Sequence, residues 1–422
     1  MLHASIPQRG RPPHQRLLYQ LVQDRHESTP AAAEARVSTP VAPASRVSAA
    51  AGPFSNGLRD DPMARFVRCL LRILHERRWL TWEQCHADSV VLQVTNAWPD
   101  PESPTRAPFL KTAVDGLTAA GVQSDVLYVR GYSGLYTYLA GAVACLLLPL
   151  VKRYQLVHGH AGEAIVVARC YLGSPVIGSY WGTDILGYLT GDRFSRIKRG
   201  LRSLALRLHS LSLSASTTKT SEMHGCLPKR SQQSNVVIPD GVDHTRFRPM
   251  DRNEARRAIG WPLDEITVIT VGRRDPVKRL DLAEAAAAEA AKVIPNLVWR
   301  AVSEVPPKAL PHYYNAADLL LHTSASEGSP NVVKEALACN LPVVATAAGD
   351  IPALLNGVTR ATVAPPTAHE LGEAIVRCVK APEPCDGRAK SQDLAIEHVT
   401  ARMLSLYRSL GLGVENISAG AD

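Results

Sequence analysis

Apolar strands that alternate with helices set the strongest limit on the fold of this chain. Continuous apolar runs such as residues 89–95 and 266–271 lack a polar face, which is typical of strands covered on both sides in a parallel sheet. Helical patterns such as residues 109–121 separate these runs, and the alternation starts again in the second half of the chain. The sequence therefore predicts an α/β fold with two doubly wound domains that face a central cleft, with ligand between them at the carboxyl ends of the strands.

The same pattern divides the chain into predicted segments. Residues 1–62 are rich in proline, alanine, serine and arginine without a sustained period, which predicts a disordered leader. Two interpretations of the leader stay open: Met63 is the true start, or the leader is a targeting peptide. The remaining predicted segments are a basic helix over 63–88, Rossmann-like domains over 89–245 and 246–393, and a C-terminal helix over 394–411.

Composition limits the partners and the compartment. A formal net charge of +8 favours anionic partners such as phosphates, acidic glycans, an anionic membrane surface or nucleic acid. The eight cysteines are scattered without a C-x-x-C pair, which fits a reducing cytoplasm better than a disulfide framework or a zinc site. The longest uncharged run, 131–151, contains tyrosines, glycines and a proline, so we interpret it as a buried helix in preference to a membrane span.

One helix start carries the features of an anion site. Ser329 is predicted to cap the helix and Pro330 to occupy its first position, where proline's missing N–H costs nothing. The next backbone amides, at Asn331, Val332 and Val333, are then unpaired donors at the positive end of the helix dipole. Such a helix start binds phosphate groups.

Two carboxylates flank this helix start. Glu327 precedes it and Glu335 lies on its second turn. Because a carboxylate accepts hydrogen bonds and does not donate them, this pair suits the hydroxyls of a sugar nucleotide. In the same predicted domain, Gly272 follows a strand and permits a close approach of ligand, while Arg273 and Lys278 place two cations on the loop. Taken alone, this loop is also explained by a solvated basic turn. Its pairing with the acidic helix in the same predicted domain favours a diphosphate clamp.

These motifs resemble the family 4 glycosyltransferases of the GT-B fold, especially bacterial members that build cell-surface polysaccharides. The resemblance covers about residues 90–410. Its most specific part is the glutamate, seven residues, glutamate pattern of 327–335 with the following Ala-Leu-Ala and Leu-Pro-Val-Val segments. Agreement extends to four further stretches: the interdomain turn at 238–249, the phosphate clamp of Gly272, Arg273 and Lys278, the approach to the acidic motif at 314–318, and the Gly-Thr-Asp loop at 180–184.

The resemblance implies roles for individual residues. It implies that Glu327 contacts the donor sugar near the reacting carbon and that Glu335 binds the ribose hydroxyls. The first domain would then hold the acceptor, the second the nucleotide sugar, and the C-terminal helix would cross back to the first. Further donor contacts are implied for a set of residues in the three matching loops: Gly272, Gly328, Ser329, Asn331, Val332 and Asp184. Retention at the anomeric carbon, no cofactor and no obligatory metal are also implied.

The chain departs from the family at two places. Trp181 stands where the family carries a histidine, and the acceptor loop reads Thr-Arg-Ala-Pro-Phe over 105–109 without its usual glycine. His158 and His160 end a predicted strand and are expected to face the cleft, so His160 is a candidate catalytic replacement. A structural role for a histidine at a strand end is the alternative.

A basic helix over 193–207 leaves two interpretations open. It carries six cations and no acid, with apolar residues at helical spacing. It is either an interfacial helix that docks on anionic lipid or a surface helix whose apolar stripe meets the core. Nucleic acid is disfavoured as a partner because no recognisable binding module accompanies the charge.

Together these observations predict a retaining glycosyltransferase. The catalytic candidates are Glu327, Arg273, Lys278 and His160, and the expected partners are a nucleotide-sugar donor and a glycan, lipid-linked or small-molecule acceptor. We expect a role in polysaccharide or glycolipid biosynthesis of the cell envelope, in the cytoplasm or peripherally on the inner membrane face. The alternative is a degenerate relative that binds sugar nucleotides without catalysis.

Overall fold

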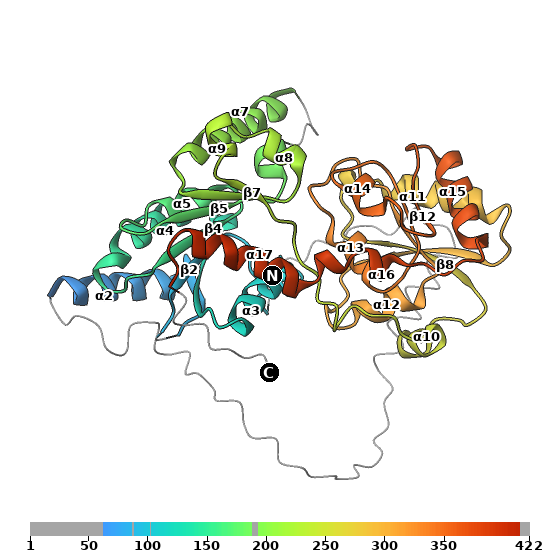
Figure 1. The fold of residues 1–422 in the computed structure, drawn as a ribbon, viewed down its shortest axis with the longest axis horizontal. Coiled ribbons are helices and arrows are strands. Elements are labelled where there is room, and N and C mark those ends of the chain that lie inside the picture. The colour runs from blue at the N-terminus through green and yellow to red at the C-terminus, as the bar shows by residue number, and fades with distance from the viewer. Residues whose placement is uncertain (1–61, 87, 102, 188–192, 414–422) are drawn as a thin grey trace, which may run out of the picture. The chain divides into compact units, whose positions relative to one another are not determined.

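The computed structural model describes residues 62–86, 88–101, 103–187 and 193–413 (Figure 1). The predicted disordered leader, apart from Pro62, lies outside these residues. The described part of the chain contains two separate sheets. None of its helices is both long and apolar enough to cross a membrane.

The first sheet has seven strands in the order β1-β3-β2-β4-β5-β6-β7. Only β1 is antiparallel, on β3, and the other pairs are parallel. The order reverses between β2 and β4, so the carboxyl ends of these strands form a switch point where such sheets bind ligand. The strands are β1 (Leu80–Gln84), β2 (Val91–Thr95), β3 (Ser124–Val129), β4 (Leu156–His160), β5 (Val176–Ser179), β6 (Ala215–Thr218) and β7 (Asn235–Val237).

Alternate side chains of this sheet enter two different cores. Leu92 and Val94 of β2 pack with one set of helices, while Val91 of the same strand packs on the opposite face. Because both faces are covered, the strands read as continuous apolar runs. Helices α2 (Pro62–Glu76), α4 (Leu135–Leu147), α5 (Gly162–Arg169) and α7 (Arg193–His209) contribute to the first core, and α3 (Pro108–Ala119) and α17 (Ile396–Ser409) cover the other face. Short helices complete this part: α6 (Thr183–Leu186), α8 (Ser221–Gly225) and α9 (Lys229–Gln232).

Two helices of the first core differ from expectation in the face that they expose. The predicted buried helix is buried on one face only, because Leu135, Leu139 and Leu146 of α4 are exposed. On α7 the apolar stripe that includes Leu201 and Leu204 is also exposed, and Leu206 makes the contact with the core instead. The interpretation of α7 as a helix whose stripe meets the core is therefore wrong.

The second sheet is fully parallel, with the order β12-β11-β10-β8-β9. Its strands are β8 (Ile266–Val271), β9 (Leu297–Val302), β10 (Leu319–His322), β11 (Val343–Ala345) and β12 (Ala361–Val363). Its helices are α10 (Arg252–Ile259), α11 (Leu280–Ala291), α12 (Leu310–Ala316), α13 (Asn331–Ala338), α14 (Ile351–Leu355), α15 (Ala368–Lys380) and α16 (Gly387–Lys390). Here the order reverses between β8 and β10, which places the loops after these two strands at the ligand-binding edge.

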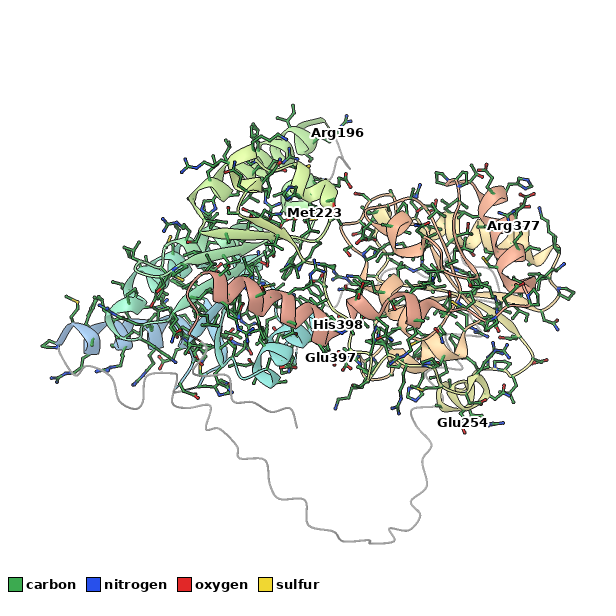
Figure 2. The ribbon with its side chains drawn as sticks, in the orientation of Figure 1. Arg196, Met223, Glu254, Arg377, Glu397 and His398 are labelled. Atoms are coloured by element: carbon green, nitrogen blue, oxygen red, sulfur yellow. The ribbon has the colours of Figure 1, made fainter. Side chains whose placement is uncertain are left out.

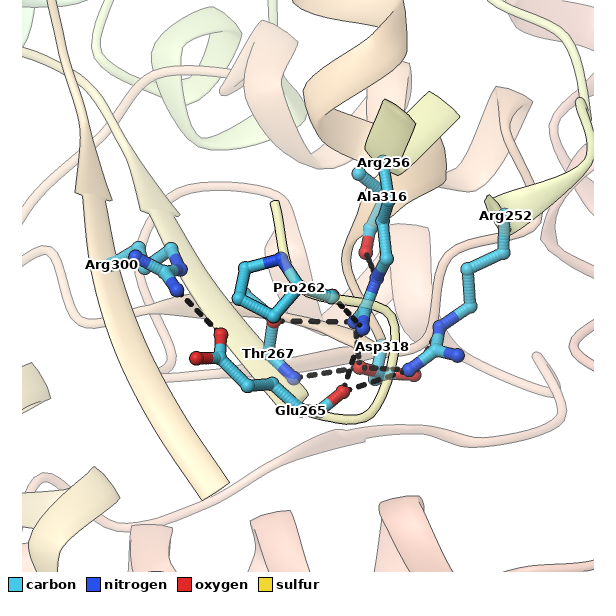
Figure 3. A network of polar contacts seen from close by, with 8 residues as sticks. All are labelled: Arg252, Arg256, Pro262, Glu265, Thr267, Arg300, Ala316 and Asp318. Atoms are coloured by element: carbon cyan, nitrogen blue, oxygen red, sulfur yellow. Dashed lines mark hydrogen bonds and ion pairs between the residues drawn. The ribbon is translucent and has the colours of Figure 1, made fainter. Parts of the chain in front are cut away.

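A buried ion-pair network fixes the opposite, amino-terminal ends of β8 and β10 (Figure 3). Arg256 of α10 is fully buried and lies 2.9 Å from Asp318, which precedes β10. The same carboxylate accepts a hydrogen bond from the backbone N–H of Thr267 in β8, and Arg252 adds a second ion pair. Since a buried charge is stabilised only when it is paired and hydrogen-bonded, this network anchors α10 to the sheet away from the ligand edge.

Candidate active site

The centre of the candidate site is Glu327, in the loop after β10. Its Oε1 lies 2.6 Å from Nζ of Lys278 and 3.3 Å from Nε2 of His322, the last residue of β10. Burial raises the pKa of Glu327, but the His322 ring and the Lys278 ammonium outweigh it and lower that pKa to about 2. Burial lowers the pKa of His322. Glu327 is therefore a stable carboxylate between two nitrogen groups.

The loop after β8 holds Lys278 in place. Asp275 caps a short 3₁₀ helix, Pro276–Lys278, by accepting a hydrogen bond from the backbone N–H of Val277. Arg279 then donates to the carbonyl of Thr323 at 2.7 Å, and the Thr323 hydroxyl donates to the carbonyl of Lys278 at 2.8 Å. These bonds tie the loop after β8 to the loop after β10. Lys278 therefore meets Glu327 through a rigid backbone rather than a long flexible turn.

The start of α13 differs from its predicted geometry. The helix is Asn331–Ala338 with Pro330 as its N-cap, and Ser329 donates its hydroxyl hydrogen to Asp350 at 2.7 Å instead of capping the helix. The backbone N–H of Val333 already donates to the carbonyl of Pro330, which corrects the expectation that it is unpaired. Asn331 and Val332 do line the main cavity. The helix start thus presents two of the three predicted residues to ligand.

Glu335 lies one turn into α13, on the cavity wall. The buried hydroxyl of Tyr314 donates to its Oε2 at 2.7 Å. Burial raises the pKa of Glu335 to about 7, against the opposing effects of the Tyr314 hydrogen bond and the nearby Arg246 and Lys334. A ligand hydroxyl that donates to this carboxylate would favour its charged form.

A cavity of about 410 Å³ joins these elements. Its volume is in the range of small-molecule sites. Gly272, with φ +141°, and the exposed Arg273 form part of its wall, as predicted from the loop sequence. The other residues that matter here are Lys278, Asn331, Val332, Glu335 and Arg246 from the second domain, and Thr105, Pro108 and Phe109 from the first.

A second cavity, of about 390 Å³, lies on the other side of Lys278. Glu327 and Lys278 line it, together with Arg199 and Arg202 of α7. Lys278 therefore borders both cavities. The first cavity suits a nucleotide, and the wall of the second contains two arginines as well as Glu327, with Arg202 paired to Glu163.

Gly328 and Asp184 act on backbone geometry, not as lining groups of either cavity. The Asp184 carboxylate is buried and accepts hydrogen bonds from the backbone N–H groups of Trp181, Gly182 and Ile185. A Cβ at Gly328 would lie 2.7 Å from the carbonyl oxygen of Trp181, so only glycine fits there. Asp184 thus shapes this loop, and its expected donor contact stays a prediction.

His160 lies elsewhere than predicted. It is buried at the end of β4, where Nε2 is 2.8 Å from Oε1 of Gln93, and it lines neither cavity beside Lys278. His158 next to it bonds Ser179 and Tyr407 of α17. Burial, with a smaller effect of Lys219, lowers the pKa of His160 to about 3. These contacts favour the structural alternative for His160 over the catalytic one.

Sequence reasoning missed three residues. His322 contacts Glu327, Arg279 fixes the loop of Lys278, and Arg246 lines the main cavity near Glu335. The only sequence signal of His322 is its position as the last residue of an apolar strand. Among the described residues, no group of three or more histidine, cysteine, aspartate and glutamate side chains could hold a metal ion.

Comparison with known proteins finds a family match over the segment that carries this site, and several relatives. Residues 255–381 match the family described as "Glycosyl transferases group 1". The chain is 28% identical to the D-inositol 3-phosphate glycosyltransferase of Rhodococcus erythropolis, over 64% of this chain and 71% of that relative. It is 32% identical to the enzyme of the same name from Mycolicibacterium paratuberculosis, over 41% of this chain but less than half, 46%, of that relative.

Solved structures share the fold at lower identity. The sucrose-phosphate synthase of Thermosynechococcus elongatus aligns with a TM-score of 0.63 and 18% identity, over 76% of this chain and 98% of that one. Anabaena HepE, solved in complex with UDP and glucose, aligns with a TM-score of 0.58 and 17% identity, over 76% of this chain and 100% of that one. These similarities identify two Rossmann-like domains of the GT-B type.

Proposed function

We propose that this chain, which belongs to the group 1 glycosyl transferases and has the GT-B fold, moves a sugar from a nucleotide-diphosphate donor to a hydroxyl acceptor. The observation that carries the proposal is the cluster of Lys278, Glu327 and His322 between two cavities. An ammonium and a helix start face one cavity, where the diphosphate would lie. The Glu327 carboxylate, with its lowered pKa, lines the other, where the sugar and acceptor would meet.

The charges of the site match the charges of the reaction. When the bond between the anomeric carbon and the diphosphate breaks, negative charge gathers on the leaving phosphate, and Lys278, Arg273 and the α13 amides would stabilise it. The anomeric carbon becomes cationic before the acceptor oxygen bonds to it, and Glu327 would favour that charge. We propose retention at this carbon, no obligatory metal and no cofactor, as the family resemblance implies.

The acceptor side suits an anionic hydroxyl compound. Arg199 and Arg202 line the cavity that contains Glu327. The curated relatives are named as glycosyltransferases of D-inositol 3-phosphate, a phosphorylated alcohol. We propose an acceptor that belongs to polysaccharide or glycolipid biosynthesis of the cell envelope, used in the cytoplasm at the inner membrane face.

A thermal-shift screen of nucleotide sugars tests the donor site. A bound donor raises the unfolding midpoint as its concentration exceeds its dissociation constant. We expect one of UDP-glucose, UDP-N-acetylglucosamine, ADP-glucose and GDP-mannose to raise it, and the variant Glu335→Ala to lose the shift. The matched control is Glu373→Ala, an exposed carboxylate of α15, which should keep it. No shift with any of these nucleotides at millimolar concentration would contradict the proposal.

A non-catalytic sugar-nucleotide binder is the second candidate. Trp181, which replaces the family histidine, packs edge-on against Phe109 at 4.9 Å between ring centres. The indole at this position therefore packs against an apolar ring, where the family resemblance implies a histidine. Slow release of free sugar from the bound donor, or its transfer to an alcohol, supports the enzyme. A thermal shift without either reaction supports the binder.

A further inference from the structure

Helix α4 places its small side chains inward and its large ones outward. The face that meets the sheet carries Thr137, Ala140, Gly141 and Ala144, all buried. The solvent face carries Leu135, Leu139 and Leu146, which are 74%, 61% and 50% exposed. A helix of a soluble domain normally buries its large apolar side chains and exposes polar ones. No charged residue lies between Leu135 and Leu147, so nothing on the helix itself offsets this exposure.

Helix α7 repeats the inversion. Ser203 and Leu206 are buried, whereas Ile197, Leu201 and Leu204 are all more than half exposed. The exposed residues recur at intervals of three and four, which puts them on one side of the helix. Scattered exposed leucines are common on protein surfaces, but a full stripe is not. We call Leu135, Leu139, Leu146, Ile197, Leu201 and Leu204 the apolar face.

The two helices belong to one layer. Helix α5 contacts both α4 and α7, and α2 contacts α4, so the four helices adjoin on one side of the first sheet (Figure 1). Val166 of α5 and Phe66 of α2 are exposed large apolar residues as well. The apolar face is therefore a feature of the whole layer rather than of one helix.

Positive charge accompanies the apolar face. α7 contains six lysines and arginines and no acidic residue, and α2 contains three arginines with a single glutamate at its end. Arg196, labelled in Figure 2, and Lys198 are exposed on α7, and Arg72 is exposed on α2. Large aliphatic side chains flanked by cations match an anionic lipid surface, where headgroups meet the cations and acyl chains meet the leucines. In a symmetric dimer built on this layer the cations of two copies would face each other, which disfavours a second copy as the occupant.

We propose that the layer of α2, α4, α5 and α7 docks on the surface of a bilayer that contains anionic lipid, with the apolar face inserted among the headgroups. The helices lie in the interface and do not span it. Docking needs neither donor nor acceptor, so it is separable from the proposed transfer reaction. It would hold the site next to a lipid-linked acceptor, and in that respect the inference deepens the proposed function.

Co-sedimentation of the full chain with vesicles tests the proposal without any sugar nucleotide. Vesicles of phosphatidylcholine alone are compared with vesicles of equal parts phosphatidylcholine and phosphatidylglycerol, at low and high salt. We expect binding to the anionic vesicles, and a loss of at least about tenfold in the double variant Leu139→Asp and Leu201→Asp. The matched control, Leu263→Asp with Val293→Asp, alters two exposed apolar residues of the second domain and should bind like the unaltered chain.

A charge reversal separates the contribution of the cations to vesicle binding from that of the apolar face. Arg196→Glu with Lys198→Glu should abolish the preference for anionic vesicles, whereas Arg257→Glu with Lys390→Glu, on exposed residues of the second domain, should leave it intact. Hydrogen exchange of the unaltered chain gives an answer that needs no variant: anionic vesicles should slow exchange in α4 and α7 but not in α11 or α15. The proposal is overturned if the unaltered chain does not bind anionic vesicles or if the apolar variants bind equally well. It is also overturned if the chain is a dimer that these variants convert to a monomer.

Discussion

Two buried clusters contain a histidine that ends a parallel strand, and they have different surroundings. His322 ends β10 beside Glu327 and Lys278. Both of these residues line the cavity of about 390 Å³, and Lys278 also lines the cavity of about 410 Å³. His160 ends β4 beside Gln93 and next to a space of only about 40 Å³, lined mostly by apolar side chains. The strand position is the same in both. What separates a candidate catalytic cluster from a structural one is a charged partner and room for a ligand.

Of the changes that test this difference between the clusters, replacement of Lys278 by alanine should cause the largest loss of turnover. The change removes the ammonium that borders both cavities, so turnover should fall by about 10²- to 10³-fold, the usual cost of losing one charge-stabilising group. The unfolding midpoint should stay close to that of the unaltered chain, because the side chain is partly exposed. Initial rates at saturating donor measure the effect. Arg274→Ala, on an exposed neighbour in the same loop, is the control.

The two histidines themselves provide the second test. His322→Gln should reduce turnover by about 10- to 50-fold, equivalent to about 2 kcal/mol for a bond to a charged group. It should also raise the pKa of Glu327 and move the acid limb of the rate profile to higher pH. His160→Gln should leave turnover unchanged. If His160→Gln folded normally and lost turnover as His322→Gln does, the distinction between the clusters would be wrong.

The fold could be predicted from the sequence because it depends on the local pattern of apolar and polar residues. Apolar runs and intervening helices recur wherever a strand is covered on both faces, so the two doubly wound domains follow from residues such as 89–95 and 266–271. Which face a helix turns toward the sheet could not be predicted from the sequence. On α4 the large residues suggest burial, but the close packing of Gly141 against Val129 and Val167 decides that the small face turns inward.

The site was predictable where adjacent residues form it and not where distant segments meet. Gly272, Arg273 and Lys278 share one loop, and the structure brings all three to one cavity. Ser329 was misassigned because its partner, Asp350, lies in a segment with no sequence link to it. His322 was missed for a different reason: it lies only five residues before Glu327, but their contact depends on the turn between them.

Acidification gives a third test, on the structural cluster. The folded-state pKa of His160 lies near 3, below its ordinary value of 6.5, so the unfolded chain binds more protons between these limits. The contribution of His160 to stability should therefore fall as pH drops from 6.5 toward 3, by about 2 kcal/mol between pH 6.5 and 5. Denaturant unfolding of the unaltered chain and of His160→Gln at these two pH values measures this contribution as a difference.

The variant His160→Gln isolates this contribution from others. Glu335, with its pKa raised to about 7, acts in the opposite direction, because its protonation in the folded state favours folding as pH falls from 7 to 4.5. That term is present in both proteins and cancels in their difference. An equal loss of stability in the variant and the unaltered chain would show that His160 is not buried neutral.

The smallest effect is expected from two buried tyrosines, Tyr407 in the cluster of His160 and Tyr314 beside Glu335 on the wall of the main cavity. Tyr407→Phe removes the hydroxyl that lies 2.7 Å from Nδ1 of His158, and Tyr314→Phe removes the donor to Glu335. Each change should lower the free energy of unfolding by about 1 kcal/mol, the net value of a typical hydrogen bond. Only Tyr314→Phe should also raise the KM for donor, because Glu335 lines the cavity and His158 does not. A KM raised equally by Tyr407→Phe would mean that the β4 cluster communicates with the donor site, and the two clusters would then act as one.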